Sequence, residues 1–69
     1  MKATALVNEY HDFAEQVVLH ENREELEQKV RKMFWQEEDI KIYDHKVTYL
    51  DSEVRDETIT WFLHELEVI

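Results

Sequence analysis

The clearest hydrophobic pattern lies in the middle of the chain. Four apolar residues recur there at helical spacing, with charged residues between them, and form a single stripe: Leu26, Val30, Met33 and Phe34. Asn22 stands before the stripe as a capping residue, and Glu25 follows three positions later, as in a capping box. The pattern predicts a helix over residues 22–36, with acidic side chains near its start and basic ones near its end.

The segment before this helix predicts a β-hairpin. We expect one strand near residues 3–10, a turn around His11 and Asp12, and a second strand near residues 15–20. A helix is the alternative, because five apolar residues share a helical face: Ala3, Leu6, Tyr10, Phe13 and Val17. The hairpin is preferred for two reasons. Residues 17–19 are rich in residues that favour strands, and a helix ending there would meet the helix that begins at Asn22 with no Gly or Pro to separate the two.

The segment after the helix alternates between apolar and polar residues, which is typical of strands. Ile40 and Ile42 predict strand, as do Val47 and Tyr49, either as one long strand or as two joined at residues 43–45. Residues 58–63 are β-branched and aromatic, and the alternation continues at Leu66 and Val68. A helix over residues 52–66 is the alternative, since its apolar residues would share one face.

These elements predict an α+β fold, a small antiparallel sheet with the central helix packed on one face, in the order ββαββ. A helix-rich fold with a central β-hairpin is the alternative. The helix stripe is expected to pack against Val17, Leu19, Ile42, Val47, Trp61 and Leu63. The second face of the sheet must then face water or a partner. Because apolar residues are too numerous for one face, a homodimer is an open alternative.

Composition narrows the possible chemistry. The 69 residues suffice for one domain, 1–69. The chain contains no Gly, Pro or Cys, so it has no P-loop, dinucleotide fingerprint, disulfide or thiolate. Backbone positions with positive φ must be filled by Asn, Asp or His. We expect no catalytic residues, no enzyme activity and no cofactor.

Charge bears on the partner. Seventeen acidic residues against eight basic ones give a net charge of −9, which argues against direct binding of nucleic acid or an anionic membrane. No signal peptide or transmembrane run is visible, and a cytoplasmic location is expected. The four histidines have no metal-binding spacing on a helix, so no metal site is expected: His11, His20, His45 and His64.

Acidic clusters and excess aromatic residues favour protein binding. Trp61 is expected in the core, whereas Trp35 is the best candidate contact residue. The partner-binding candidates are Trp35, Glu37, Glu38, Asp39, Asp51, Glu53, Asp56 and Glu57. In size and charge, the chain resembles phage and mobile-element inhibitors that occupy basic grooves of nucleic-acid enzymes, which implies an inhibitor or regulator of a basic protein. The alternative is a self-associating structural or accessory protein whose interface is the apolar sheet face.

Overall fold

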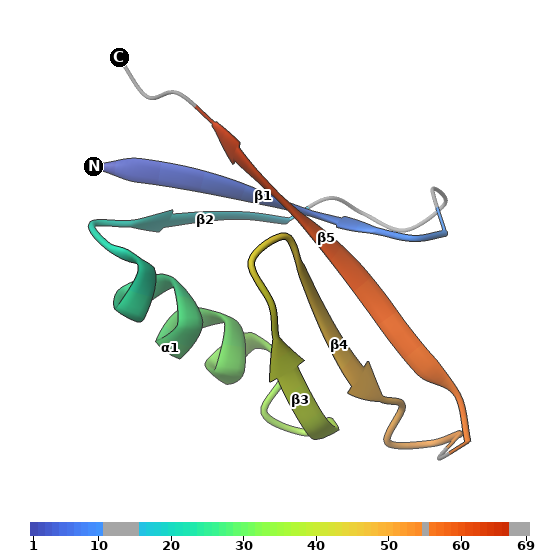
Figure 1. Cartoon of the computed structure of the whole chain (residues 1–69). Coiled ribbons are helices and arrows are strands. Elements are labelled where there is room, and N and C mark those ends of the chain that lie inside the picture. Colours follow the sequence, from blue (N-terminus) through green and yellow to red (C-terminus); the bar gives the residue numbers. More distant parts are fainter. Residues whose placement is uncertain (11–15, 55, 67–69) are drawn as a thin grey trace.

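The computed structural model describes residues 1–10, 16–54 and 56–66. Within them, five strands form one antiparallel sheet in the order β2-β1-β5-β4-β3 (Figure 1). The elements are β1 (Lys2–Asn8), β2 (Gln16–His20), α1 (Arg23–Met33), β3 (Glu38–Ile42), β4 (Lys46–Leu50) and β5 (Thr58–Leu66). The predicted α+β class is therefore confirmed, and the order of elements is ββαβββ.

The structure has one strand more than the predicted order ββαββ, and it comes from the segment after the helix, where the sequence allowed either one long strand or two. Residues 40–49 form two strands, β3 and β4, joined by a tight connection at residues 43–45. Arg23 at the start of α1 holds this connection, since its guanidinium donates to the carbonyl oxygens of Tyr43 (2.6 Å) and Asp44 (3.4 Å). A contact between distant segments thus fixes a turn that contains no Gly.

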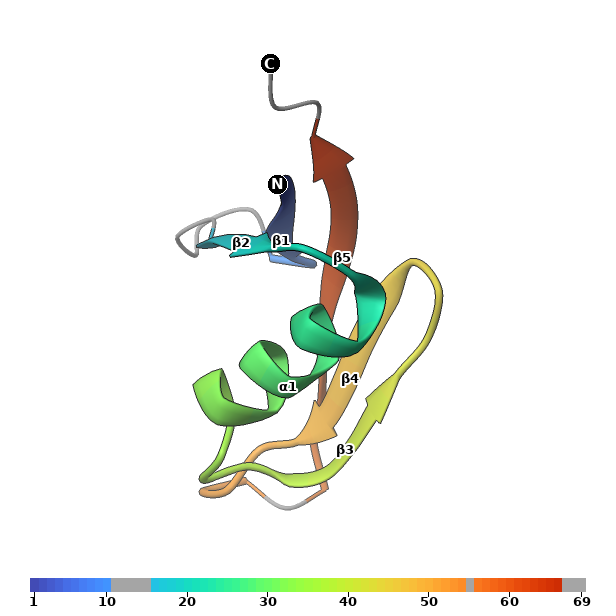
Figure 2. The ribbon, with the colours of Figure 1, turned by 90° about the vertical axis from the view of Figure 1, so that its left-hand side faces the viewer.

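The sheet curls around α1, which lies in its hollow (Figure 2). Leu6 lies opposite Leu63, and Val18 lies opposite Thr4, two residues from Leu6 and on the same face, so these apolar side chains point toward the helix together. Leu26 and Val30 of α1 complete the contact from the helix side. The buried apolar cluster comprises Leu6, Val18, Leu26, Val30, Val47, Tyr49, Trp61 and Leu63.

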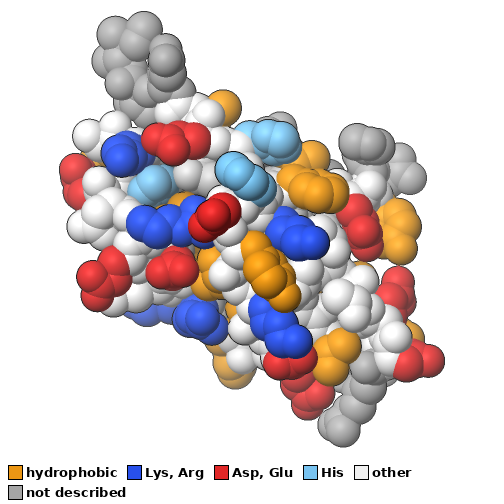
Figure 3. Space-filling model, viewed as in Figure 1, with side chains coloured by type: hydrophobic (Ala, Val, Ile, Leu, Met, Phe, Trp, Pro, Cys, Tyr) orange, Lys and Arg blue, Asp and Glu red, His pale blue; other side chains and the backbone are white. Residues whose placement is uncertain are grey.

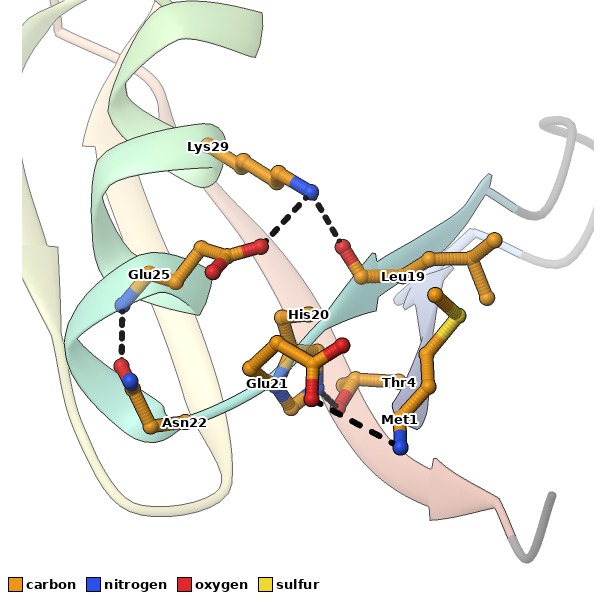
Figure 4. Close-up of polar contacts among 8 residues, drawn as sticks. All are labelled: Met1, Thr4, Leu19, His20, Glu21, Asn22, Glu25 and Lys29. Atoms are coloured by element: carbon orange, nitrogen blue, oxygen red, sulfur yellow. Dashed lines mark hydrogen bonds and ion pairs between the residues drawn. The ribbon is translucent and has the colours of Figure 1, made fainter.

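The start of α1 follows local chemistry. The Asn22 side chain accepts a hydrogen bond from the Glu25 backbone N–H at 2.9 Å, as the capping pattern predicts. The Glu25 carboxylate contacts Lys29 at 3.0 Å, and the Lys29 ammonium also donates to the carbonyl oxygen of Leu19 (Figure 4). The hydrogen bond from Lys29 holds the pKa of Glu25 below its ordinary value. Lys29 therefore ties the helix to strand β2.

The end of α1 departs from the prediction. The helix stops at Met33, three residues before the predicted end, because Phe34 leaves helical geometry with φ −108° and ψ 31°. The Phe34 N–H still bonds to the Val30 oxygen, and Glu37 closes a turn onto the Phe34 oxygen at 2.9 Å. Met33 was expected in the packed stripe but is exposed, whereas Phe34, the next residue, packs against the core cluster.

The flanking strands are largely as predicted. Strand β1 ends at Asn8, two residues early, and β2 covers most of its predicted range. The turn around His11 and Asp12 lies outside the described residues. The C-terminal segment is strand β5, so the alternative helix over residues 52–66 is wrong. Hydrogen bonds to both β1 and β4 stabilise this strand, and single-segment periodicity cannot reveal such bonds.

One packing prediction is wrong for a simple geometric reason. Val17 and Leu19 were expected to face the helix, yet 57% and 49% of their surface is exposed. Val18 and His20, the alternate residues of β2, are buried instead. In an apolar run such as residues 17–19, both registers are plausible, and pairing with β1 selects one.

Candidate functional site

The predicted partner-binding residues come together at one end of the molecule. They lie on the α1–β3 connection with the start of β3, and on the β4–β5 connection, which run side by side at the bottom of Figures 1 and 2. We call this region the acidic end: Trp35, Glu37, Glu38, Asp39, Asp51, Glu53, Asp56 and Glu57.

Backbone and side-chain bonds join the two connections of the acidic end. The Glu37 carboxylate accepts a hydrogen bond from the Ser52 N–H at 2.8 Å. Glu38 pairs with Leu50 in the sheet, which places it beside the start of the β4–β5 connection. These contacts bring the two acidic segments of the sequence close together in space.

The β4–β5 connection is ordered by Asp51. Its carboxylate oxygen accepts hydrogen bonds from the N–H groups of Glu53 (2.7 Å) and Val54 (3.1 Å). Its own N–H donates to the Glu57 oxygen at 3.0 Å and closes the loop. An Asp side chain that caps its own loop commonly replaces Gly in a turn. Asp51 is therefore a structural member of the acidic end, whereas Glu53, Asp56 and Glu57 are exposed.

Asp39 occupies a special backbone position. Its φ of 53° lies in the left-handed region, at the irregularity between Glu38 and Lys41 in the β3–β4 pairing. Aspartate tolerates this region better than most residues, as expected for a chain without Gly. Its carboxylate lies 3.6 Å from the Lys41 ammonium, and both side chains are well exposed. Such a surface pair contributes little to stability.

The two tryptophans lie in different environments, as the sequence predicted. Trp61 is buried, and its indole N–H donates to the Tyr49 hydroxyl at 3.0 Å. Trp35 lies on the α1–β3 connection with 74% of its surface exposed. A large aromatic side chain left in solvent beside carboxylates suits a contact with another protein.

A pocket of about 560 Å³ adjoins the acidic end. Tyr49 lies in the wall of this pocket, and burial raises the pKa of its hydroxyl. The hydrogen bond from Trp61 lowers that pKa, whereas the nearby carboxylates of Glu37 and Asp51 raise it further. The pocket thus combines aromatic surface with carboxylates, a lining that suits a cationic side chain. Its lining residues are Asn8, Tyr10, Tyr49, Asp51, Glu57, Ile59 and Trp61.

The histidines form a second feature that the sequence did not reveal. His20 of β2, His45 of the β3–β4 connection and His64 of β5 line one cleft of about 410 Å³. Figure 3 shows histidine side chains beside Lys and Arg side chains on this face. Their convergence depends on strand order, which sequence spacing does not encode. The His20 ring bonds to the Thr4 hydroxyl at 2.8 Å (Figure 4). Among the described residues, no group of three or more His, Asp or Glu side chains could hold a metal ion.

A third feature is the outward side of strands β2, β1 and β5. Val17, Leu19, Phe62 and Leu66 are all exposed there, and α1 lies on the opposite side of the sheet. The sequence predicted an uncovered sheet face but assigned Val17 and Leu19 to the covered one. The available signal was that neighbouring residues in β2 and β5 are both apolar, which indicates strands hydrophobic on two sides.

Comparison with known proteins adds no assignment, because no family model, curated protein or solved structure matches this chain. Within the described parts of the chain, no helix has both the length and the apolar character needed to cross a membrane.

Proposed function

We propose that this chain is a non-catalytic protein-binding module that docks its acidic end onto a basic surface of another protein. The observation that carries the proposal is the convergence of two acidic segments, joined by the bond between Glu37 and the Ser52 N–H, beside exposed Trp35. A basic groove that normally holds nucleic acid is the partner surface with matching charge. In this role the protein acts as an inhibitor or regulator of a nucleic-acid-handling protein.

Carboxylates and an aromatic side chain have different roles in binding at the acidic end. Exposed Glu53, Asp56 and Glu57 supply attraction at a distance and set the orientation of approach. Trp35 supplies the contact area that becomes dry on binding. The adjoining pocket accepts a Lys or Arg side chain of the partner, with Tyr49 and Trp61 in its wall.

The basic residues of the helix limit the size of the acidic surface. Arg31 and Lys32 lie in the last turn of α1, shortly before Trp35. These basic residues separate the acidic end from the exposed carboxylates at the start of the helix, such as Glu24. The proposal is accordingly a compact docking site and not a long imitation of a phosphate backbone.

The test compares two sets of charge changes that alter the net charge equally. One variant neutralises the acidic end with Glu53→Gln, Asp56→Asn and Glu57→Gln. The control neutralises three exposed carboxylates elsewhere with Glu21→Gln, Glu24→Gln and Glu65→Gln. Each protein serves as bait in an extract of the cells that encode it, and the captured proteins are identified after washes at low and high salt.

We expect one basic protein to be retained at low salt by the wild type and the control, and to be lost at high salt. With that protein purified, the acidic-end variant should bind about tenfold more weakly. Trp35→Ser should weaken binding by about thirtyfold if Trp35 is a central contact. Equal binding by both triple variants, or binding that survives high salt, would refute docking through the acidic end.

A further inference from the structure

The outward side of the sheet carries an apolar surface, which we call the outer apolar face: Ala3, Ala5, Val7, Val17, Leu19, Phe62 and Leu66. His64, which pairs with Ala5, lies among these residues. The residues of the face form cross-strand rows. Ala3 pairs with Leu19 on one side and with Leu66 on the other, and Val7 pairs with Phe62. Ala3 and Ala5 are buried between these larger neighbours, which are themselves exposed apart from the half-buried Val7.

The outer apolar face differs from the rest of the surface in charge. The chain has 17 acidic residues, yet no outward position of strands β1, β2, β4 or β5 carries a carboxylate. The outward charged or titratable residues of these strands are Lys46 and His64. On the same side of the sheet, Glu38 lies on edge strand β3, at the acidic end. In a chain with net charge −9, the outward positions of these four strands are thus free of negative charge.

We infer that the outer apolar face binds a second copy of this chain, face to face, in a symmetric dimer. A second copy supplies an apolar surface of matching size, and it keeps the carboxylates of both copies away from the contact. A two-fold axis through this face places the same residues on both sides of the interface. Two sheets stacked in this way reproduce the packing of a β-sandwich, with α1 on the outside of each layer.

The same observations disfavour other occupants. A basic protein surface would have to bury its charged side chains against an apolar face whose outward strand positions offer no carboxylate to pair with them. The proposed partner of the acidic end therefore does not account for this face, and the inference stands independently of that proposal. An apolar sheet face of this kind on a small domain without disulfides is commonly covered by self-association.

The size of the face sets the expected strength of the dimer. Strands of seven, five and nine residues contribute to it. With strands about 4.8 Å apart and about 3.4 Å of rise per residue, the footprint is on the order of 400 Å² per copy. The two copies together contribute about 800 Å², which is below the roughly 1,200 Å² at which stable interfaces begin, so we expect a weak, reversible dimer with micromolar affinity.

The test measures oligomeric state against concentration for matched variants. Val17→Glu places a carboxylate in the middle row of the face, where Val17 pairs with Ala5. Val54→Glu makes the same change in the β4–β5 connection, at a valine with similar exposure. Sedimentation velocity from about 1 µM to about 1 mM covers the expected range. Phe62→Thr is a second interface variant, and threonine, like phenylalanine, is a residue type enriched in strands.

We expect the wild type and Val54→Glu to dimerise over this range, and Val17→Glu and Phe62→Thr to weaken the dimer by tenfold or more. Added salt should strengthen the dimer, because it screens the repulsion between two copies of charge −9. The same salt weakens docking through the acidic end, so the two proposals can fail separately. A wild-type monomer at every concentration would overturn the inference. So would a Val54→Glu effect as large as that of Val17→Glu.

Discussion

The two sides of strands β1 and β5 make an instructive comparison. On the inner side, Leu6 and Leu63 are packed under α1, and Leu6 has no exposed surface. On the outer side, Phe62 and Leu66 belong to the same strand as Leu63, yet each keeps more than 40% of its surface exposed. Neighbouring residues of one strand, equally hydrophobic, thus have different surroundings because α1 covers one side of the sheet (Figure 2).

The hydrophobic pattern of a strand indicates how many of its faces are covered. Sheets with one wet face usually alternate apolar and polar residues, whereas strands covered on two faces are apolar throughout. β1 and β5 follow the second pattern over residues 5–7 and 61–63, although only one helix covers them. In this middle part the strands have the composition of a sheet covered on two faces, which is a physical basis for the proposed dimer.

The largest expected effect comes from the same truncation on both sides. Leu6→Ala leaves a cavity under α1 and should lower the free energy of unfolding by about 2–5 kcal/mol. Leu19→Ala removes the same atoms from the outer apolar face and should cost less than about 1 kcal/mol in the monomer. Urea unfolding at a protein concentration below the dimerisation range measures both values.

The dimer makes this comparison sharper. At high protein concentration, Leu19→Ala should also weaken dimerisation, so its apparent cost should increase with concentration. The cost of Leu6→Ala should increase much less. If Leu19→Ala were as damaging as Leu6→Ala in dilute solution, the outer side would be packed within the monomer, and the contrast between the two sides would be wrong.

The sequence predicted those features that depend on neighbouring residues. The start of α1 was predictable because Asn22 and Glu25 interact within one turn. The exposure of Trp35 was predictable because it follows the apolar stripe. The acidic end was predictable as two segments, since carboxylates gather at residues 37–39 and 51–57, but their joining through Glu37 and Ser52 was not.

Features that depend on strand order could not be predicted. His20, His45 and His64 share a cleft because β5 pairs with β1, which is distant from it in the sequence, as well as with β4. The inward register of β2 was equally hidden, because Val17, Val18 and Leu19 offer apolar side chains in both directions. The pairing of β2 with β1, a tertiary contact, decides which of them faces the helix.

A smaller effect concerns the helix that covers the inner side. Asn22→Ala removes the side-chain oxygen that accepts from the Glu25 N–H, and should lower the free energy of unfolding by about 1 kcal/mol. Gln28→Ala, at an exposed position within α1, is the control and should be neutral or slightly stabilising. Chemical denaturation monitored by circular dichroism measures both. An equal loss in the two variants would show that the cap does not hold α1 in place.

The smallest expected effect is a change in alkaline stability at the inner side. Burial raises the pKa of Tyr49 above its ordinary value near 10, because the charged form is disfavoured there. Its contribution is therefore fully present below the ordinary pKa, and is lost as the pH rises through the higher pKa of the folded protein. Tyr49→Phe should make the fall in Tm above pH 10 less steep, by a few degrees at most.

This prediction is tested by how steeply Tm falls with pH, and not by the value of Tm at any one pH. Tyr49→Phe also leaves the buried indole N–H of Trp61 without its acceptor, which lowers Tm at every pH. Tyr43→Phe removes a phenol from the exposed β3–β4 connection and should leave the alkaline slope as in the wild type. Equal slopes for all three proteins would mean that Tyr49 is accessible to water, and that the inner side is less completely covered than its packing indicates.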